Sequence, residues 1–218
     1  MNYIKYSILK MSLLLILISG CKDHPTSIEQ PKTEIDYGTY DISTYMPLSI
    51  GNRWIYEVRG TGEIATLDRR IIDSVRISVD LLMFSFGEDV LLYPPSTNLT
   101  LAGYYGHRGG TIYFEIALGP QSSPLYPLLT SPIAVTNSWS AVNGAGVRDT
   151  FKIISINSGS FNNQYIDTIV AVKRWRNGWV DTTWFGRTVG ILKEVSYSYY
   201  SSDTLSSIRH LYSFTPTP

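Results

Sequence analysis

The chain has 218 residues, of which 44% are hydrophobic and 17% charged, with 18 basic and 18 acidic side chains. This balance excludes the strongly basic surface that nucleic-acid binding would need. A single cysteine excludes an intramolecular disulfide, and the abundance of tyrosine (16) and tryptophan (5) favours strands over helices.

The first residues have the features of an export signal. Lys5 and Lys10 precede or flank an apolar run, Met11–Ile18, which is too short to span a bilayer as a permanent helix. A basic leader, a short apolar run and small residues at its end are typical of a secretory signal. We therefore expect residues 1–20 to be a signal peptide. The alternatives are an ordinary signal that happens to hold a cysteine, and a buried N-terminal helix.

The end of this segment, Ile18–Cys21, resembles the lipobox of bacterial lipoproteins. The resemblance implies cleavage after Gly20, attachment of diacylglycerol to the Cys21 sulfur, and acylation of the new amine with a chain such as palmitate. Several acyl chains, each contributing about 0.8 kcal/mol per buried CH₂, would anchor the protein stably in a membrane. A modified thiol also excludes thiol catalysis.

The residues after Cys21 bear on location. Lys22 is not the aspartate that retains enteric lipoproteins in the inner membrane, so the resemblance implies the outer membrane of the cell envelope. Lys22-Asp23 also resembles the surface-export signals of some other bacteria, which leaves the leaflet open.

The stretch that follows has the composition of a linker. Residues 21–44 are polar, contain Pro25 and Pro31 and show no periodicity, which predicts a flexible tether behind the lipidated N-terminus. No second stretch of this kind follows, so we expect residues 45–218 to form a single β-rich domain. Without Lys5 and Lys10 the chain has 16 basic and 18 acidic side chains, close to neutral.

Alternation of apolar and polar residues predicts strands along most of this domain. The clearest runs are Arg70–Asp80, in which Ile72 is out of pattern, Thr111–Leu118 and Ile191–Tyr199. Strands with one apolar face and one solvent-exposed polar face are typical of antiparallel sheet. A short helical turn is expected at Leu81–Phe86. The predicted fold is all-β, an antiparallel sheet that forms a barrel, half-barrel or sandwich, with little helix after the signal peptide.

The strongest local signal is Asn177-Gly178 between two strand-like runs, because both residues of a two-residue hairpin turn need positive φ. Such a loop fixes the register of the two strands. The expected pairs are Arg176 with Trp179, Arg174 with Asp181, Val172 with Thr183, and Val170 with Phe185. A cation–aromatic pair and an ion pair, each worth roughly 0.2–1 kcal/mol, should stabilise a solvated tip. A second hairpin is expected at Ser201–Asp203.

Two longer motifs resemble a family of uncharacterised bacterial lipoproteins known as TapB-like. Pro47–Tyr56 reads Pro-Leu-x-x-Gly-Asn-x-Trp-x-Tyr, and Trp184–Lys193 is similar to that family's Gly-Val-Gly-Leu-Val-Lys-like ending. Between them, Asn137–Trp139 and Ser158–Phe161 resemble two further elements. The resemblance implies an all-β domain on a lipid anchor, and it implies no known substrate and no catalytic residues.

The physical interpretation of both motifs is structural. Trp54 shares a strand face with Tyr56 and Val58, and is expected to be a core plug that buries about 150–250 Å². Gly190 is expected to allow a bulge or a close approach of the backbone.

No catalytic pattern emerges from the remaining polar residues. His24, His107 and His210 lack the spacing of metal ligands, the carboxylates are scattered, and no nucleophile or phosphate-binding motif occurs. We therefore expect no enzymatic activity, no cofactor and no metal site.

Aromatic residues are the remaining candidates for ligand contact. Tyr104, Tyr105, Trp175 and Trp179 could form a stacking surface for sugar or an apolar pocket. The alternative is that they fill the sheet core and pair across strands.

The leading hypothesis is a non-enzymatic binding, carrier or assembly module, held at a membrane through the lipid on Cys21. Its partner would be an envelope protein, a glycan or a lipid, and not a nucleic acid. One alternative is a carbohydrate- or peptidoglycan-binding module that uses exposed aromatics. Others are a hydrolase with an unrecognised site and a half-barrel that holds an acyl chain.

Overall fold

The computed structural model describes residues 41–60, 64–78, 81–91, 100–116, 125–142, 146–199 and 204–217. The chain divides into two units, Met1–Asp36 and Tyr37–Pro218, and every described residue belongs to the second. The expected signal peptide, Cys21 and the turn at Ser201–Asp203 lie outside the described residues. Within the described ranges, no helix is both long and apolar enough to cross a membrane.

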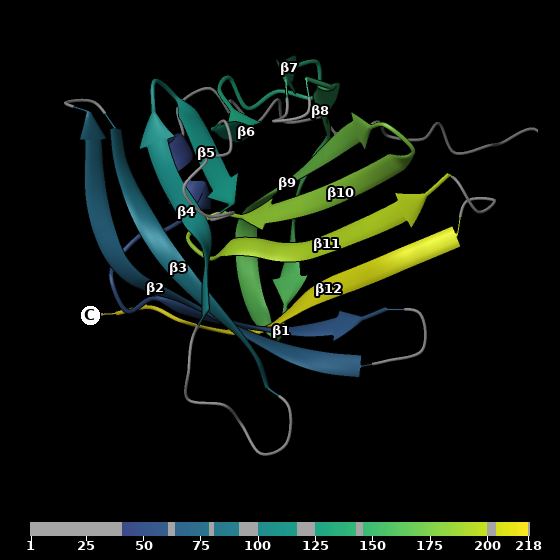
Figure 1. Cartoon of the computed structure of the whole chain (residues 1–218). Helices are drawn as coiled ribbons and strands as arrows, with labels where there is room; N and C mark the ends of the chain where they lie inside the picture. Colours follow the sequence, from purple (N-terminus) through teal and green to yellow (C-terminus); the bar gives the residue numbers. More distant parts are fainter. Residues whose placement is uncertain are drawn as a thin grey trace, which may run out of the picture. The chain divides into compact units, whose positions relative to one another are not determined.

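Twelve strands form one antiparallel sheet (Figure 1). Their bounds are β1 Arg53–Arg59, β2 Ile64–Ser78, β3 Leu81–Leu91, β4 Thr100–Arg108, β5 Thr111–Ile116, β6 Tyr126–Thr130, β7 Ser138–Val142, β8 Arg148–Phe161, β9 Gln164–Arg176, β10 Trp179–Gly186, β11 Gly190–Ser198 and β12 Thr204–Thr215. The 3-10 helix η2, Ile42–Tyr45, precedes them. The order across the sheet is β6-β5-β4-β3-β2-β1-β12-β11-β10-β9-β8-β7. The all-β antiparallel prediction is confirmed.

The sheet curls until its two edge strands, β6 and β7, face each other without a backbone ladder between them. Side chains bridge this seam. Trp139 Nε1 donates to the Pro127 carbonyl at 3.0 Å, and Asn137 Nδ2 donates to the Thr130 carbonyl at 2.8 Å. Among the three architectures expected from the sequence, the structure is therefore a nearly closed barrel.

The two longer sequence motifs meet in the core. Trp54 of β1 is fully buried, stacks on Phe214 with ring centroids 5.2 Å apart, and donates from Nε1 to the Val189 carbonyl at 2.7 Å. Gly190 has a φ of 99°, and a Cβ at this position would lie 3.1 Å from Trp54 Nε1. The expected burial of Trp54 and the expected close approach of the backbone at Gly190 therefore belong to the same contact.

Two local predictions have different outcomes. The β9–β10 hairpin has the expected register, from Arg176 opposite Trp179 to Val170 opposite Phe185. The expected helical turn at Leu81–Phe86 is wrong, because this segment belongs to β3 and pairs with β2 on one side and β4 on the other.

The break in the pattern at Ile72 has a structural cause. The β2–β3 register shifts between Ile71 and Asp73, and Ile72 is exposed. A bulge inserts one extra residue into a strand, so the alternation of faces is interrupted there.

Candidate functional site

At the ends of β9 to β12 the usual distribution of polar and apolar side chains is reversed. Arg176 of β9 and Ser196 of β11 face the inside of the barrel, where they line a cavity. Their sequence neighbours Trp175 and Tyr197 point to the outer face and are exposed. Successive side chains of a strand point to opposite faces, so placing the charges inside places these aromatic rings outside.

The cavity has a volume of about 250 Å³ and two chemically different walls. Four strands of one wall contribute Tyr105, Phe114, Leu128 and Phe151. The other wall combines the apolar residues Val172, Phe185 and Ile191 with a larger polar set. Its members from β9 to β12 include Arg174, Arg176, Asp181, Thr183, Glu194, Ser196, Ser207 and Arg209. A concave site with an apolar wall and a few convergent polar groups is the usual form of a small-molecule site.

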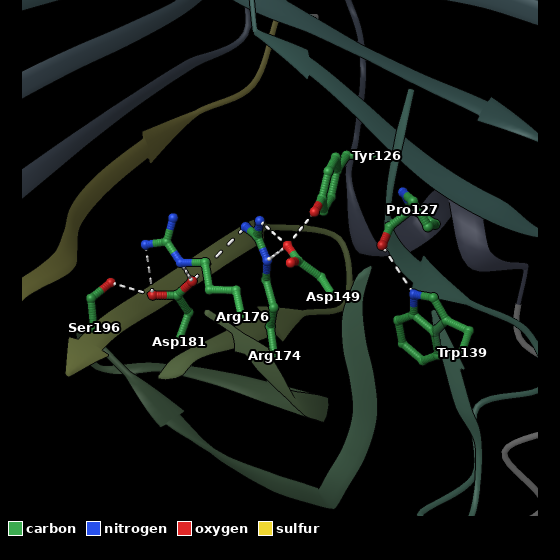
Figure 2. A network of polar contacts seen from close by, with 8 residues as sticks. All are labelled: Tyr126, Pro127, Trp139, Asp149, Arg174, Arg176, Asp181 and Ser196. Carbon is green, nitrogen blue, oxygen red and sulfur yellow. Dashed lines mark hydrogen bonds and ion pairs between the residues drawn. The ribbon is translucent and has the colours of Figure 1, made fainter. Parts of the chain in front are cut away.

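The most buried polar contact beside the cavity joins three strands (Figure 2). Asp149 of β8 is fully buried, and its Oδ2 accepts from Arg174 Nε at 2.9 Å and from Arg174 Nη2 at 2.5 Å. The Tyr126 hydroxyl of β6 donates to the same oxygen. Burial, together with the hydrogen bond to Asp149, raises the pKa of Tyr126 to about 12, so this hydroxyl stays a donor at neutral pH.

A second group lies on the neighbouring strands (Figure 2). Asp181 of β10 forms an ion pair with Arg176 Nε at 2.9 Å and accepts from Ser196 Oγ at 2.7 Å. Arg174, the residue opposite Asp181 in the hairpin, is 3.9 Å from its carboxylate. The predicted Arg174–Asp181 pair is therefore present, but the shorter contacts of Arg174 are with Asp149. The predicted cation–aromatic pair is confirmed, with Arg176 Cζ 5.3 Å from the centre of the Trp179 ring.

Two further arginines complete the inward set. Arg209 of β12 donates from Nη1 to Glu194 Oε2 at 2.8 Å. Arg69 of β2 is buried, donates from Nε to Glu88 at 2.6 Å and from Nη1 to the Tyr105 hydroxyl at 2.5 Å. Burial raises the pKa of Tyr105 to about 12, so this phenol stays neutral.

Three buried polar atoms beside the cavity have no hydrogen-bond partner among the described residues. They are Asp149 Oδ1, the Tyr56 hydroxyl and Arg176 Nε, which has only its ion-pair contact with Asp181. The guanidinium groups of Arg69 and Arg209 lie 5.4 and 5.8 Å from the centre of the Tyr56 ring. Buried groups of this kind are normally satisfied by protein or ordered water, so each needs an explanation.

The aromatic residues selected from the sequence do not share one surface. Tyr105 lines the cavity, whereas its neighbour Tyr104 points to the opposite face of β4. Trp179 pairs with inward-facing Arg176, whereas Trp175 pairs with Val180 on the outer face. Lys173 Nζ lies 5.4 Å from the centre of the Trp175 ring. The ligand contact predicted for these four residues, and the lipidation of Cys21, remain predictions.

Sequence reasoning missed most of the charged wall. The hairpin register placed Arg174 and Asp181 side by side, which was a usable signal. Nothing local linked them to Asp149, which lies on the preceding strand β8, or to Arg209, which lies on the last strand β12. In the described part of the chain, no three His, Cys, Asp or Glu side chains gather where they could hold a metal ion.

No protein-family model matches the chain, and no curated protein matches it. Solved structures that resemble it include a candidate lipoprotein from Parabacteroides distasonis, with 10% identity and a TM-score of 0.49, over 79% of this chain and 98% of that chain. Another is a candidate exported protein with a YmcC-like fold from Bacteroides fragilis, with 10% identity and a TM-score of 0.45, over 77% and 97%. The resemblance to TapB-like lipoproteins therefore remains a prediction.

Proposed function

We propose that the chain is a lipid-anchored protein of the cell envelope, and that its barrel is a non-enzymatic module that binds a small polar ligand in the cavity. The observation that carries this proposal is the placement of four arginines and two acids on the wall of one cavity of about 250 Å³.

Stability alone does not account for charges in this place. Burying an ion pair removes both groups from water, and replacing a buried pair by apolar side chains of similar volume is often neutral or stabilising. The barrel already contains an apolar core in which Trp54, Phe185 and Ile191 are fully or almost fully buried. A polar wall beside such a core is therefore best explained by a ligand that it contacts.

The residues of this wall also help to choose among the alternative functions. A carrier for a long acyl chain would need apolar lining on all sides, and the arginine-rich wall does not offer it. A glycan surface built on Trp175 and Trp179 would need the two rings on one face, whereas they lie on opposite faces of the sheet. For a hydrolase, Asp181 and Glu194 are the nearest candidate carboxylates, and each is engaged by an arginine.

The anchor is tested separately from the cavity. Intact-mass measurement of the protein from its native host should show residues 1–20 removed and acyl chains on Cys21. Cys21→Ala should release the protein from outer-membrane fractions. An unmodified Cys21 would contradict the anchor while leaving the cavity proposal open.

The cavity is tested with two neighbouring threonines. Thr183 lines the cavity and Thr182 lies on the outer face of the same strand. Thermal-shift screening of the purified chain against amino sugars, sugar acids, dipeptides and short fatty acids should find a stabilising compound. Thr183→Trp should abolish its effect, because the indole fills the cavity, and Thr182→Trp should retain it. Equal behaviour of the two folded variants would contradict a ligand site in the cavity.

A further inference from the structure

One edge of an arginine guanidinium in the cavity has no hydrogen-bond partner among the described residues. A guanidinium has five N–H donors. Among the described residues, Arg209 uses only Nη1, toward Glu194 at 2.8 Å. Its position is fixed by this bond and by the Tyr56 ring below it. The adjacent Nε and Nη2 groups therefore have no hydrogen-bond partner among the described residues. They form a pair of parallel donors in a fixed position, on a side chain that is 28% exposed.

Both acids of the same wall already have an arginine partner. Asp181 accepts from Ser196 and forms its ion pair with Arg176. Glu194 accepts from Arg209, and Asp149 lies behind Arg174, outside the lining of the cavity. The edge of Arg209 that is left open consists of N–H donors, so it fits a ligand that brings oxygen acceptors.

The charge of the site limits the ligand further. Each inward arginine has an acidic partner: Glu88 for Arg69, Asp149 for Arg174, Asp181 for Arg176 and Glu194 for Arg209. The set is neutral, so a dianion would meet Asp181 and Glu194 without a matching surplus of positive charge. A single negative charge, delocalised over two oxygens, suits one guanidinium edge because the two groups form parallel hydrogen bonds.

The opposite wall of the cavity supplies apolar contacts for the rest of the ligand. Phe114, Leu128 and Phe151 are apolar and line the same cavity. We propose that the ligand is a small monocarboxylate with an apolar or aromatic body, and that the Nε–Nη2 edge of Arg209 binds the carboxylate bidentately. This inference rests on the proposed binding function and names the ligand class for it.

Matched probes test the carboxylate. Titration calorimetry of the purified full chain would compare N-acetyl-L-phenylalanine with its neutral amide, glucuronate with methyl glucoside, and both acids with inorganic phosphate. We expect an acid to bind and its neutral counterpart to bind at least about tenfold more weakly. The first pair carries the aromatic body of the proposed ligand, whereas the second has a polar sugar body, so we expect N-acetyl-L-phenylalanine to bind more tightly than glucuronate.

Matched variants test Arg209. Arg209→Gln should weaken binding of the acid at least about tenfold, and Arg209→Gln with Glu194→Gln should do the same without leaving an unpaired acid. Arg59→Gln is the control, because Arg59 is exposed and pairs with Glu57. Equal affinity for acid and amide, stronger binding of phosphate, or unchanged affinity in both Arg209 variants would overturn the carboxylate assignment. Binding of neutral probes that Thr183→Trp abolishes would overturn it too, yet would leave the proposed function standing.

Discussion

The barrel has two ion networks built around a buried aspartate, one inside and one outside. Inside, Asp149 is fully buried and holds Arg174 beside the cavity. On the outer face, Asp68 is 1% exposed and pairs with Arg53 at 2.9 Å and Arg70 at 2.5 Å. The two aspartates are equally hidden, but their arginines differ: those of Asp68 are 38% and 42% exposed, and Arg174 is 25% exposed.

Strand pairing explains the outer network. Arg53 of β1 lies directly opposite Arg70 of β2, and like charges in this position are destabilising. Asp68 bonds to both and offsets the repulsion. No such register conflict requires the inward charges of β9 to β12. The comparison teaches that equal burial of two carboxylates can have a structural cause in one place and, under the proposed binding function, a ligand-related cause in another.

Removing the inner aspartate should have the largest effect. Asp149→Asn leaves the Arg174 guanidinium without its buried counter-charge, and the expected loss in free energy of unfolding is about 3–5 kcal/mol. Urea denaturation followed by circular dichroism measures it. The double variant Asp149→Asn with Arg174→Gln should recover part of the lost free energy of unfolding, because the uncompensated charge is then gone. A loss below about 1 kcal/mol would show that the inner network is as hydrated as the outer one.

Removing the outer aspartate should cost less. In Asp68→Asn the two arginines can turn into water, so the expected loss is about 1 kcal/mol. Burial alone would raise the pKa of Asp68, but the hydrogen bonds from Arg53 and Arg70 outweigh it and lower the pKa below 3.8. The stabilisation is therefore present above pH 3.8 and lost as the pH falls through the folded-state pKa. Acid titration of unfolding should show a steeper decline in wild type than in the variant.

The buried histidine His107 offers a further comparison with these ion pairs. Burial lowers the pKa of His107 below 6.5, and the nearby Asp41 and a hydrogen bond to the Met46 backbone offset this only in part. The unfolded chain then binds the proton more readily, so stability falls as the pH drops below about 6.5. His107→Gln should flatten the pH dependence of the unfolding midpoint between pH 7.5 and 5. An unchanged slope would assign that dependence to other groups.

The smallest effect on stability is expected at Arg209 and Glu194, where the proposed effect on binding is largest. Arg209→Met with Glu194→Leu replaces an inward ion pair by apolar side chains, which should leave the free energy of unfolding unchanged or higher. The same protein should no longer bind the acid probes in calorimetry. A marked loss of stability would mean that this pair, like the outer network, serves the fold.

The sequence by itself determined the local features of this protein. Alternation identified the antiparallel strands, Asn177-Gly178 set the β9–β10 register residue by residue, and Trp54 and Gly190 had the roles that their chemistry suggested. These features depend on neighbours along the chain or on conformations open to only a few residue types. The segment Leu81–Phe86 was misassigned because its apolar run fits a turn or a strand, and only pairing on both sides decides between them.

Tertiary structure alone decided which face of each strand is inside. A period of two defines two faces and does not say which one the curled sheet encloses, so Arg176 inward and Trp175 outward could not be read from the pattern. Nor could the partner of Arg174, because Asp149 reaches it from β8 rather than across the hairpin turn. The cavity is a product of closure, which brings together side chains from strands that are far apart in the sequence.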